Sequence, residues 1–219
     1  MKSKTTLLSA IAALAMGFAA TAAAPVEADP IQVPQCQYFN QLITIDLSTT
    51  PTVGATDPHW RVSGPTGFLA PGHTTLSAWT ALPNNWVQPS APSATAERRQ
   101  PVGDYTYSLQ FFLPCDPTNY RFVDLSGNVA ADNEITSVSA NGNPSVASCA
   151  GTCFNTPIGG TPFAIPTVQL HSGLNTLQIV VHNDSSYTGI SVVAHLTVRC
   201  GRYCCRTLPL KKFYPEETR

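Results

Sequence analysis

The amino-acid sequence predicts an all-β protein, an antiparallel β-sandwich or jelly roll of about eight or nine strands. Three observations lead to this fold class: short segments in which apolar and polar residues alternate, frequent turn residues, and the overall composition. Only 11% of the 219 residues are charged, whereas 43% are hydrophobic, and the chain contains 19 Pro and 14 Gly. This composition excludes a disordered chain and is more typical of an exported β domain than of a cytosolic helical one.

The clearest predicted strand covers residues 104–113. Its alternate residues are aromatic or aliphatic and share one face of an extended chain: Tyr105, Tyr107, Leu109, Phe111 and Leu113. The intervening Thr106, Ser108 and Gln110 are polar, so the segment is typical of a strand with one buried face. Pro114 ends it, because proline has no N–H to donate to a ladder.

Seven further strands are predicted before and after this one. Their ranges are 41–47, 59–63, 120–131, 134–140, 163–170, 174–183 and 187–198. The turns Asn141-Gly142-Asn143 and Ser172-Gly173 separate several of them, because Asn and Gly tolerate a positive φ. Alternation in the last two strands predicts an inward face formed by Leu177, Ile179, Val181, Ile190, Val192, Ala194, Leu196 and Val198.

Residues 83–101 interrupt the series of strands. They contain four prolines and many Ser, Ala and Thr residues, with little alternation. We expect a surface loop here that carries Trp86. Nothing in the sequence indicates an internal repeat or a hinge, so a single domain is expected.

The first 28 residues are typical of a secretory signal peptide. Lys2 and Lys4 precede an apolar run over residues 7–20, and small residues lead to an expected cleavage site near Ala28. The run of about 14 residues is shorter than the roughly 20 that span a bilayer. We therefore expect a signal peptide over 1–28, a sandwich domain over 29–198, a tail over 199–219, and no transmembrane segment in the mature chain. The expected location is extracellular or at the cell surface, with the periplasm as the alternative.

The formal net charge of −1 conceals two oppositely charged regions. Residues 29–198 contain ten acidic and four basic residues, a net charge of −6, whereas residues 199–219 contain six basic and two acidic residues, a net charge of +4. The acidic body argues against nucleic-acid binding, which requires a basic face. The basic tail has two interpretations, a solvated terminus or a segment that docks on the body or on an anionic polymer.

Seven cysteines predict disulfides in an exported protein. They are Cys36, Cys115, Cys149, Cys153, Cys200, Cys204 and Cys205. Cys149 and Cys153 enclose a short glycine-containing loop and are expected to form a local bridge. Cys36 and Cys115 are expected to pair with two of the last three cysteines, in an order that the sequence leaves open. Adjacent Cys204 and Cys205 are expected to serve different partners, and a metal site formed by the last three is less favoured because no paired C-x2-C spacing occurs.

Several short segments along residues 57–198 carry a resemblance to a known family, each weak alone but together in a specific order. They are Asp57–Val62, Trp86-Val87, Gly103–Tyr107, Ala130–Glu134, Asn141-Gly142 and Gly173–Leu177. Together they resemble secreted bacterial β-sandwich domains of the galactose-binding-like superfamily, which includes discoidin domains and carbohydrate-binding modules. The resemblance implies a sandwich that binds a ligand, in some cases with a structural calcium ion. The basic, cysteine-rich tail departs from the sorting signals that end several such proteins, so the resemblance implies no mode of anchoring.

Candidate ligand-binding residues follow from how sugars are bound. Aromatic faces stack on sugar C–H groups, while amides and carboxylates hydrogen-bond the hydroxyls. The candidates near predicted loops and strand ends are Trp79, Trp86, Asp132, Asn133, Glu134, Asn183, Asp184 and Tyr187. Trp60 lies within a predicted strand and is assigned to the core instead. The alternative role of Asp132 and Asn133 is to turn the chain.

The expected function is a non-catalytic exported module that recognises a carbohydrate or a surface polymer. One alternative is a structural or adhesive protein that engages protein partners or self-assembles, and a less favoured one is a secreted hydrolase. The sequence contains no H-E-x-x-H, G-x-S-x-G or phosphate-binding glycine motif, and its five histidines are scattered. No catalytic residue, metal ligand or cofactor is therefore assigned beyond the calcium ion that the resemblance implies.

Overall fold

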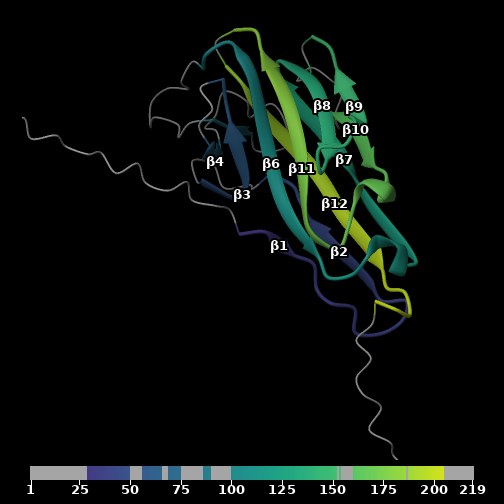
Figure 1. Ribbon diagram of the computed structural model, residues 1–219. Helices are drawn as coiled ribbons and strands as arrows, with labels where there is room; N and C mark the ends of the chain where they lie inside the picture. Colours follow the sequence, from purple (N-terminus) through teal and green to yellow (C-terminus); the bar gives the residue numbers. More distant parts are fainter. Residues whose placement is uncertain are drawn as a thin grey trace, which may run out of the picture.

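The computed structural model describes residues 29–49, 56–65, 69–74, 86–89, 100–151, 153, 160–185 and 187–204. Within these residues the chain forms twelve β-strands and two short 3-10 helices, and no α-helix. Two layers of mostly antiparallel strands face each other in a β-sandwich, as the sequence predicts (Figure 1). None of the described residues belongs to a helix with the length and apolar character needed to cross a membrane.

The strands vary from two to eleven residues. In chain order they are β1 (Ile31–Gln32), β2 (Leu42–Asp46), β3 (Thr56–Ser63), β4 (Leu69–Thr74), β5 (Val87–Gln88), β6 (Gly103–Leu113), β7 (Phe122–Asp132), β8 (Glu134–Ala140), β9 (Ala147–Cys149), β10 (Thr161–Ile165), β11 (Gly173–Asn183) and β12 (Gly189–Arg199). The 3-10 helices are η1 (Pro117–Asn119), which follows β6, and η2 (Thr167–Gln169), which follows β10.

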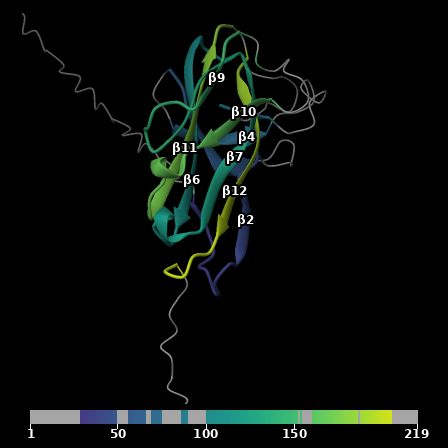
Figure 2. The same ribbon diagram turned by 90° about the vertical axis from the view of Figure 1, so that its right-hand side faces the viewer.

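The strand order divides the sandwich into two layers. One layer contains β10, β7, β12 and β2, and the other contains β3, β6, β11, β8 and β9. Figure 2 shows β6 and β11 on one side of the molecule and β7, β12 and β2 on the other. Short strands β5 and β4 connect β12 to β3, so hydrogen bonding continues from one layer to the other. β1 pairs with β6 in parallel, and every other pair is antiparallel.

The core lies between the layers and is built from the predicted inward faces. Tyr105, Tyr107, Leu109, Phe111 and Leu113 of β6 are all buried, and so are the predicted inward residues of β11 and β12. Trp60 is buried as well, and its indole Nε1 donates a hydrogen bond to the Leu47 carbonyl at 3.2 Å. Each fully buried large apolar side chain stabilises the fold by roughly 1.5–3 kcal/mol relative to an exposed one.

Two sequence predictions are corrected by the fold. The strand expected over 163–170 ends at Ile165, because Pro166 opens the 3-10 helix η2. Trp86 does not lie on a surface loop: it is 1% exposed and precedes the two-residue strand β5, in which Val87 pairs with Ile190 of β12. A strand of two residues has no alternation to detect, so the proline-rich composition dominated the prediction.

The register places two groups of loops at opposite ends of the sandwich. We call one the cross-linked end: it contains residues 33–41, 114–121 and 200–204, beyond the row in which Arg199 pairs with Phe122 and Leu42. We call the other the polar end: it contains residues 100–104, 132–134, 182–185 and 187–189, where Asn183 pairs with Gly103 and Gly189 with Asp132. Strands β6, β7, β11 and β12 run between the two ends.

Three disulfides join six of the seven cysteines. Cys149 bonds to Cys153, which confirms the predicted local bridge. At the cross-linked end Cys36 bonds to Cys200 and Cys115 to Cys204, with Cα atoms 5.7 and 5.6 Å apart. The two pairs settle the order that the sequence left open, and Cys205 lies outside the described residues.

Candidate functional site

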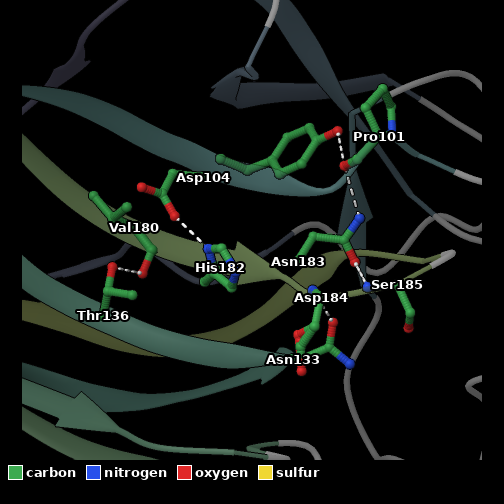
Figure 3. Close-up of polar contacts among 10 residues, drawn as sticks. Pro101, Asp104, Asn133, Thr136, Val180, His182, Asn183, Asp184 and Ser185 are labelled. Atoms are coloured by element: carbon green, nitrogen blue, oxygen red, sulfur yellow. Dashed lines mark hydrogen bonds and ion pairs between the residues drawn. The ribbon is translucent and has the colours of Figure 1, made fainter.

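The polar end brings together most of the predicted site residues. Asp132, Asn133 and Glu134 form the connection between β7 and β8, and Asp184 directly follows β11. The Asp184 backbone N–H donates to the Asn133 Oδ1 at 3.1 Å, so the two connections contact each other (Figure 3). Tyr187 follows on the β11–β12 connection and is half-buried. These predicted residues therefore lie at one end of the sandwich, and their role in ligand binding stays a prediction.

His182 lies at the centre of this cluster, although the sequence did not single it out. It pairs across the sheet with Asp104 of β6 on one side and Glu134 of β8 on the other. Its Nδ1 lies 2.7 Å from the Asp104 Oδ1, with 41% of the histidine and 66% of the aspartate side chain exposed (Figure 3). The hydrogen bond to Asp104 raises the pKa of His182, and the charges of Asp104, Asp184 and Glu134 add to the effect.

Asn183 is buried and makes hydrogen bonds within the protein. Its side chain is buried, and its Nδ2 donates to the carbonyls of Pro101 at 2.9 Å and Gln100 at 3.3 Å. Its Oδ1 accepts from the Ser185 N–H at 3.4 Å. Tyr105 Oη donates to the same Pro101 carbonyl at 2.9 Å. The Asn183 amide thus connects the residues before β6 to the end of β11, and its predicted contact with a ligand stays a prediction.

The tryptophan candidates do not provide a stacking platform in the described structure. Trp86 is buried, and its place in the core corrects the expectation of an exposed indole face. Trp79 lies outside the described residues. The described residues contain no group of three or more His, Cys, Asp or Glu side chains arranged to hold a metal ion.

The cross-linked end carries a different surface. Of the nine large apolar side chains that are exposed in the described residues, Tyr38, Phe39 and Tyr203 lie in its loops, and Leu42 and Phe122 lie in the strand row that borders it. These five side chains lie near three arginines, by position in the sequence, by strand pairing or by a ring contact. We call this set the aromatic–arginine surface: Tyr38, Phe39, Leu42, Phe122, Tyr203, Arg121, Arg199 and Arg202.

Phe39 is the centre of the aromatic–arginine surface. The guanidinium carbons of Arg121 and Arg202 each lie 5.4 Å from the centroid of its ring, within the range of a cation–π contact. Arg121 Nη1 also donates to the Asn40 Oδ1 at 2.6 Å. Tyr38 precedes Phe39 in the sequence and is 61% exposed, and Tyr203 follows Arg202 and is 85% exposed. Both side chains are therefore open to solvent.

The backbone beneath this surface is held firmly. Asn40 N–H donates to the Cys200 carbonyl at 3.0 Å, and Cys200 N–H donates to the Gln41 carbonyl at 2.8 Å. Arg121 N–H donates to the Arg199 carbonyl at 2.9 Å. Gly201 packs so closely against the Asn119 carbonyl that a Cβ atom there would overlap it. Together with the two disulfides, these contacts hold in place the backbone that carries the exposed side chains.

Sequence reasoning missed the aromatic–arginine surface. Its members are spread over three segments, 38–42, 121–122 and 199–203, and none forms a motif on its own. The available signal was the position of Tyr38, Phe39 and Tyr203 within three residues of disulfide-forming cysteines. Without the pairing of Cys36 with Cys200, that signal does not show that the segments meet.

The comparisons with known proteins add no relative to this picture. No protein-family model matches the chain, and no curated protein matches it.

Proposed function

We propose that this protein is an exported, non-catalytic binding module, of the galactose-binding-like type that its sequence resembles, and that it recognises a carbohydrate or another surface polymer. The gathering of exposed aromatic side chains at the cross-linked end carries the proposal. The predicted signal peptide, the three disulfides and the absence of a spanning helix among the described residues are compatible with export.

Physical chemistry favours this end as the binding surface. Sugar rings present apolar C–H faces that stack on Tyr and Phe rings, while guanidinium and phenol groups hydrogen-bond the hydroxyls. Tyr38, Phe122 and Tyr203 offer such rings, and Arg199 and Arg202 lie beside them in the sequence or across the sheet. Because the disulfide-linked loops are already ordered, little conformational entropy is lost when a ligand binds.

The test is a binding screen of residues 29–219, produced with its disulfides, against a panel of neutral and charged polysaccharides. We expect at least one polysaccharide to bind, and the Tyr38→Ala/Tyr203→Ala variant to lose about tenfold or more in affinity for it. Val102→Ala is the matched control, because Val102 is also exposed and apolar but lies at the polar end. Binding to no polysaccharide in the panel would overturn the proposal.

A second arm locates the site. The Glu134→Gln/Asp184→Asn variant changes the polar end and leaves the aromatic–arginine surface intact. If this variant loses binding while Tyr38→Ala/Tyr203→Ala retains it, the ligand site is at the polar end that sequence reasoning selected. If the aromatic variant alone loses binding, the site is at the cross-linked end.

A second candidate function is self-association, and the opposite charges of the two ends favour it. Asp104, Asp132, Glu134 and Asp184 lie at the polar end, whereas Arg121, Arg199 and Arg202 lie at the other. Contact between the ends of two molecules would bring these charges together. Analytical ultracentrifugation at about 20 mM and about 500 mM NaCl tests it, because such an assembly dissociates at high salt. A monomer at both salt concentrations, up to about 100 µM protein, would exclude it.

A further inference from the structure

The arginines of the aromatic–arginine surface form no ion pair with another described residue. Three of the four arginines in the described residues belong to this surface, and Arg61 is the fourth. The described residues contain two ion pairs, His182 with Asp104 and His195 with Asp46, and neither includes an arginine. Arg121, Arg199 and Arg202 therefore carry positive charge that no carboxylate of the described chain neutralises.

The one carboxylate in the loops of the cross-linked end is already engaged. Asp116 accepts hydrogen bonds from the backbone N–H and the hydroxyl of Thr118, at the start of the 3-10 helix η1. These hydrogen bonds lower the pKa of Asp116. The local positive charge thus stands out against a body whose net charge is −6.

The geometry leaves the guanidinium edges available. Arg121 and Arg202 contact the Phe39 ring, and Arg121 uses one N–H group to hold Asn40. A guanidinium has five N–H donors and stays protonated at any physiological pH, so several donors per arginine remain for an external acceptor. Their planar arrangement suits carboxylate, phosphate and sulfate groups, which accept two parallel hydrogen bonds.

We propose that the aromatic–arginine surface binds an anionic polysaccharide, one that carries carboxylate or sulfate groups on its sugar rings. The acidic groups pair with Arg199, Arg202 and the free edge of Arg121, and the sugar rings stack on Tyr38 and Tyr203. This inference rests on the proposed function and names its ligand class. The acidic body favours a polysaccharide over a nucleic acid, because the denser phosphate charge of a nucleic acid is repelled beyond the small basic surface.

The experiment measures the affinity of the disulfide-bonded chain, residues 29–219, for four polymers by isothermal titration calorimetry. They are a neutral polysaccharide, a uronic-acid polysaccharide, a sulfated polysaccharide and a single-stranded oligonucleotide. We expect one or both acidic polysaccharides to bind at least about tenfold more tightly than the neutral one. That affinity should fall by about tenfold or more between 50 and 500 mM NaCl, because the ionic contacts are exposed and screened by salt.

Variants connect the charge preference to the surface. Arg199→Ala/Arg202→Ala should weaken binding of the acidic polysaccharide by at least about tenfold. The control is Arg98→Ala/Arg99→Ala, which removes the same charge directly before Gln100, a residue of the polar end. Circular dichroism and a free-thiol assay check that each variant folds with its disulfides formed. Arg199→Lys/Arg202→Lys retains the charge, and an intermediate affinity is expected because the planar hydrogen bonds are lost.

The possible failures are separable. Equal binding of neutral and acidic polysaccharides without salt dependence overturns the anionic inference but leaves the proposed function standing. A loss that is equal in Arg199→Ala/Arg202→Ala and in the control also overturns it, because the effect then follows net charge alone. Tighter binding of the oligonucleotide than of every polysaccharide overturns it in favour of a nucleic-acid ligand. Binding to none of the four polymers overturns both proposals.

Discussion

The two ends of the sandwich are closed by different means. At the cross-linked end, two disulfides tie the loops together and exposed aromatic rings and arginines cover them. At the polar end of the same long strands, buried and half-buried amides do the equivalent work, with Asn183 holding residues 100–101 and Asn133 holding Asp184. Disulfides hold the loops of one end without help from its exposed side chains, which can therefore be apolar. Hydrogen bonds hold the loops of the other end, and they contribute more when their amide groups are shielded from water.

The largest expected effect comes from opening the covalent end. Cys36→Ala/Cys200→Ala removes a bridge between residues 164 positions apart and should lower the free energy of unfolding by about 2–5 kcal/mol. Cys149→Ala/Cys153→Ala opens a loop with a separation of only 4 and should cost roughly 2 kcal/mol or less, because the unfolded chain gains less freedom. Urea unfolding of both variants measures the difference. A larger loss from the local bridge would contradict the comparison.

The corresponding change at the polar end should cost less. Asn183→Ala leaves the carbonyls of Gln100 and Pro101 without their amide donor and should lower the free energy of unfolding by about 1–3 kcal/mol. Ser185→Ala is the control, because Ser185 contributes its backbone N–H and not its side chain to this contact. Thermal or urea unfolding of both variants gives the result. A loss in Asn183→Ala no larger than in the control would show that the amide does not close this end.

A smaller effect is expected from the ring contact at the cross-linked end. In a double-mutant cycle, Phe39→Leu and Arg202→Ala should show a coupling energy of about 0.5–1 kcal/mol, the usual value for an exposed cation–π pair. Leucine retains apolar bulk but has no ring face, so the coupling reports the aromatic contact. Urea unfolding of the four proteins supplies the data. A coupling indistinguishable from zero would mean that Phe39 does not position Arg202.

The smallest effect is a change in pH response at the polar end. The pKa of His182 is raised chiefly by its hydrogen bond to Asp104, so the folded protein holds this proton more tightly than the unfolded chain. The resulting stabilisation is fully present below the ordinary histidine value of about 6.5 and disappears as the pH rises through the raised pKa. An NMR titration should show the His182 pKa falling in Asp104→Asn. An unchanged or higher value in that variant would contradict the assignment.

The sequence predicted the parts of the fold that repeat with a period of two. Strands β6, β11 and β12 have eleven residues each; β6 and β11 alternate along their length and β12 does so from Val192 onward, so the predicted inward residues could be assigned one by one. Strand β5 has two residues, and β1 owes its place to pairing with β6. Strands of this length are set by tertiary contacts rather than by local pattern, which is why Trp86 was assigned to the surface.

The candidate sites show the same division. Asp132, Asn133, Glu134 and Asp184 follow or precede long strands, so their gathering at one end could be expected from the strand predictions alone. The aromatic–arginine surface depends instead on which cysteines pair, and cysteine spacing does not determine pairing. His182 lay inside a correctly predicted strand, but its partner Asp104 is known only from the register of β6 against β11.

The Cys36–Cys200 disulfide also determines how the molecule would bear a mechanical load. Its two cysteines lie near the two limits of the described chain, Cys36 after β1 and Cys200 directly after β12. Tension applied to both termini passes through the sulfur atoms from one position to the other. The strands from β2 to β12 lie between the two cysteines and so outside the path of the force. Of the described strands, only β1 lies on that path. A pull between the two termini would therefore act on the pairing of β1 with β6 and would not load the pairing among strands β2 to β12.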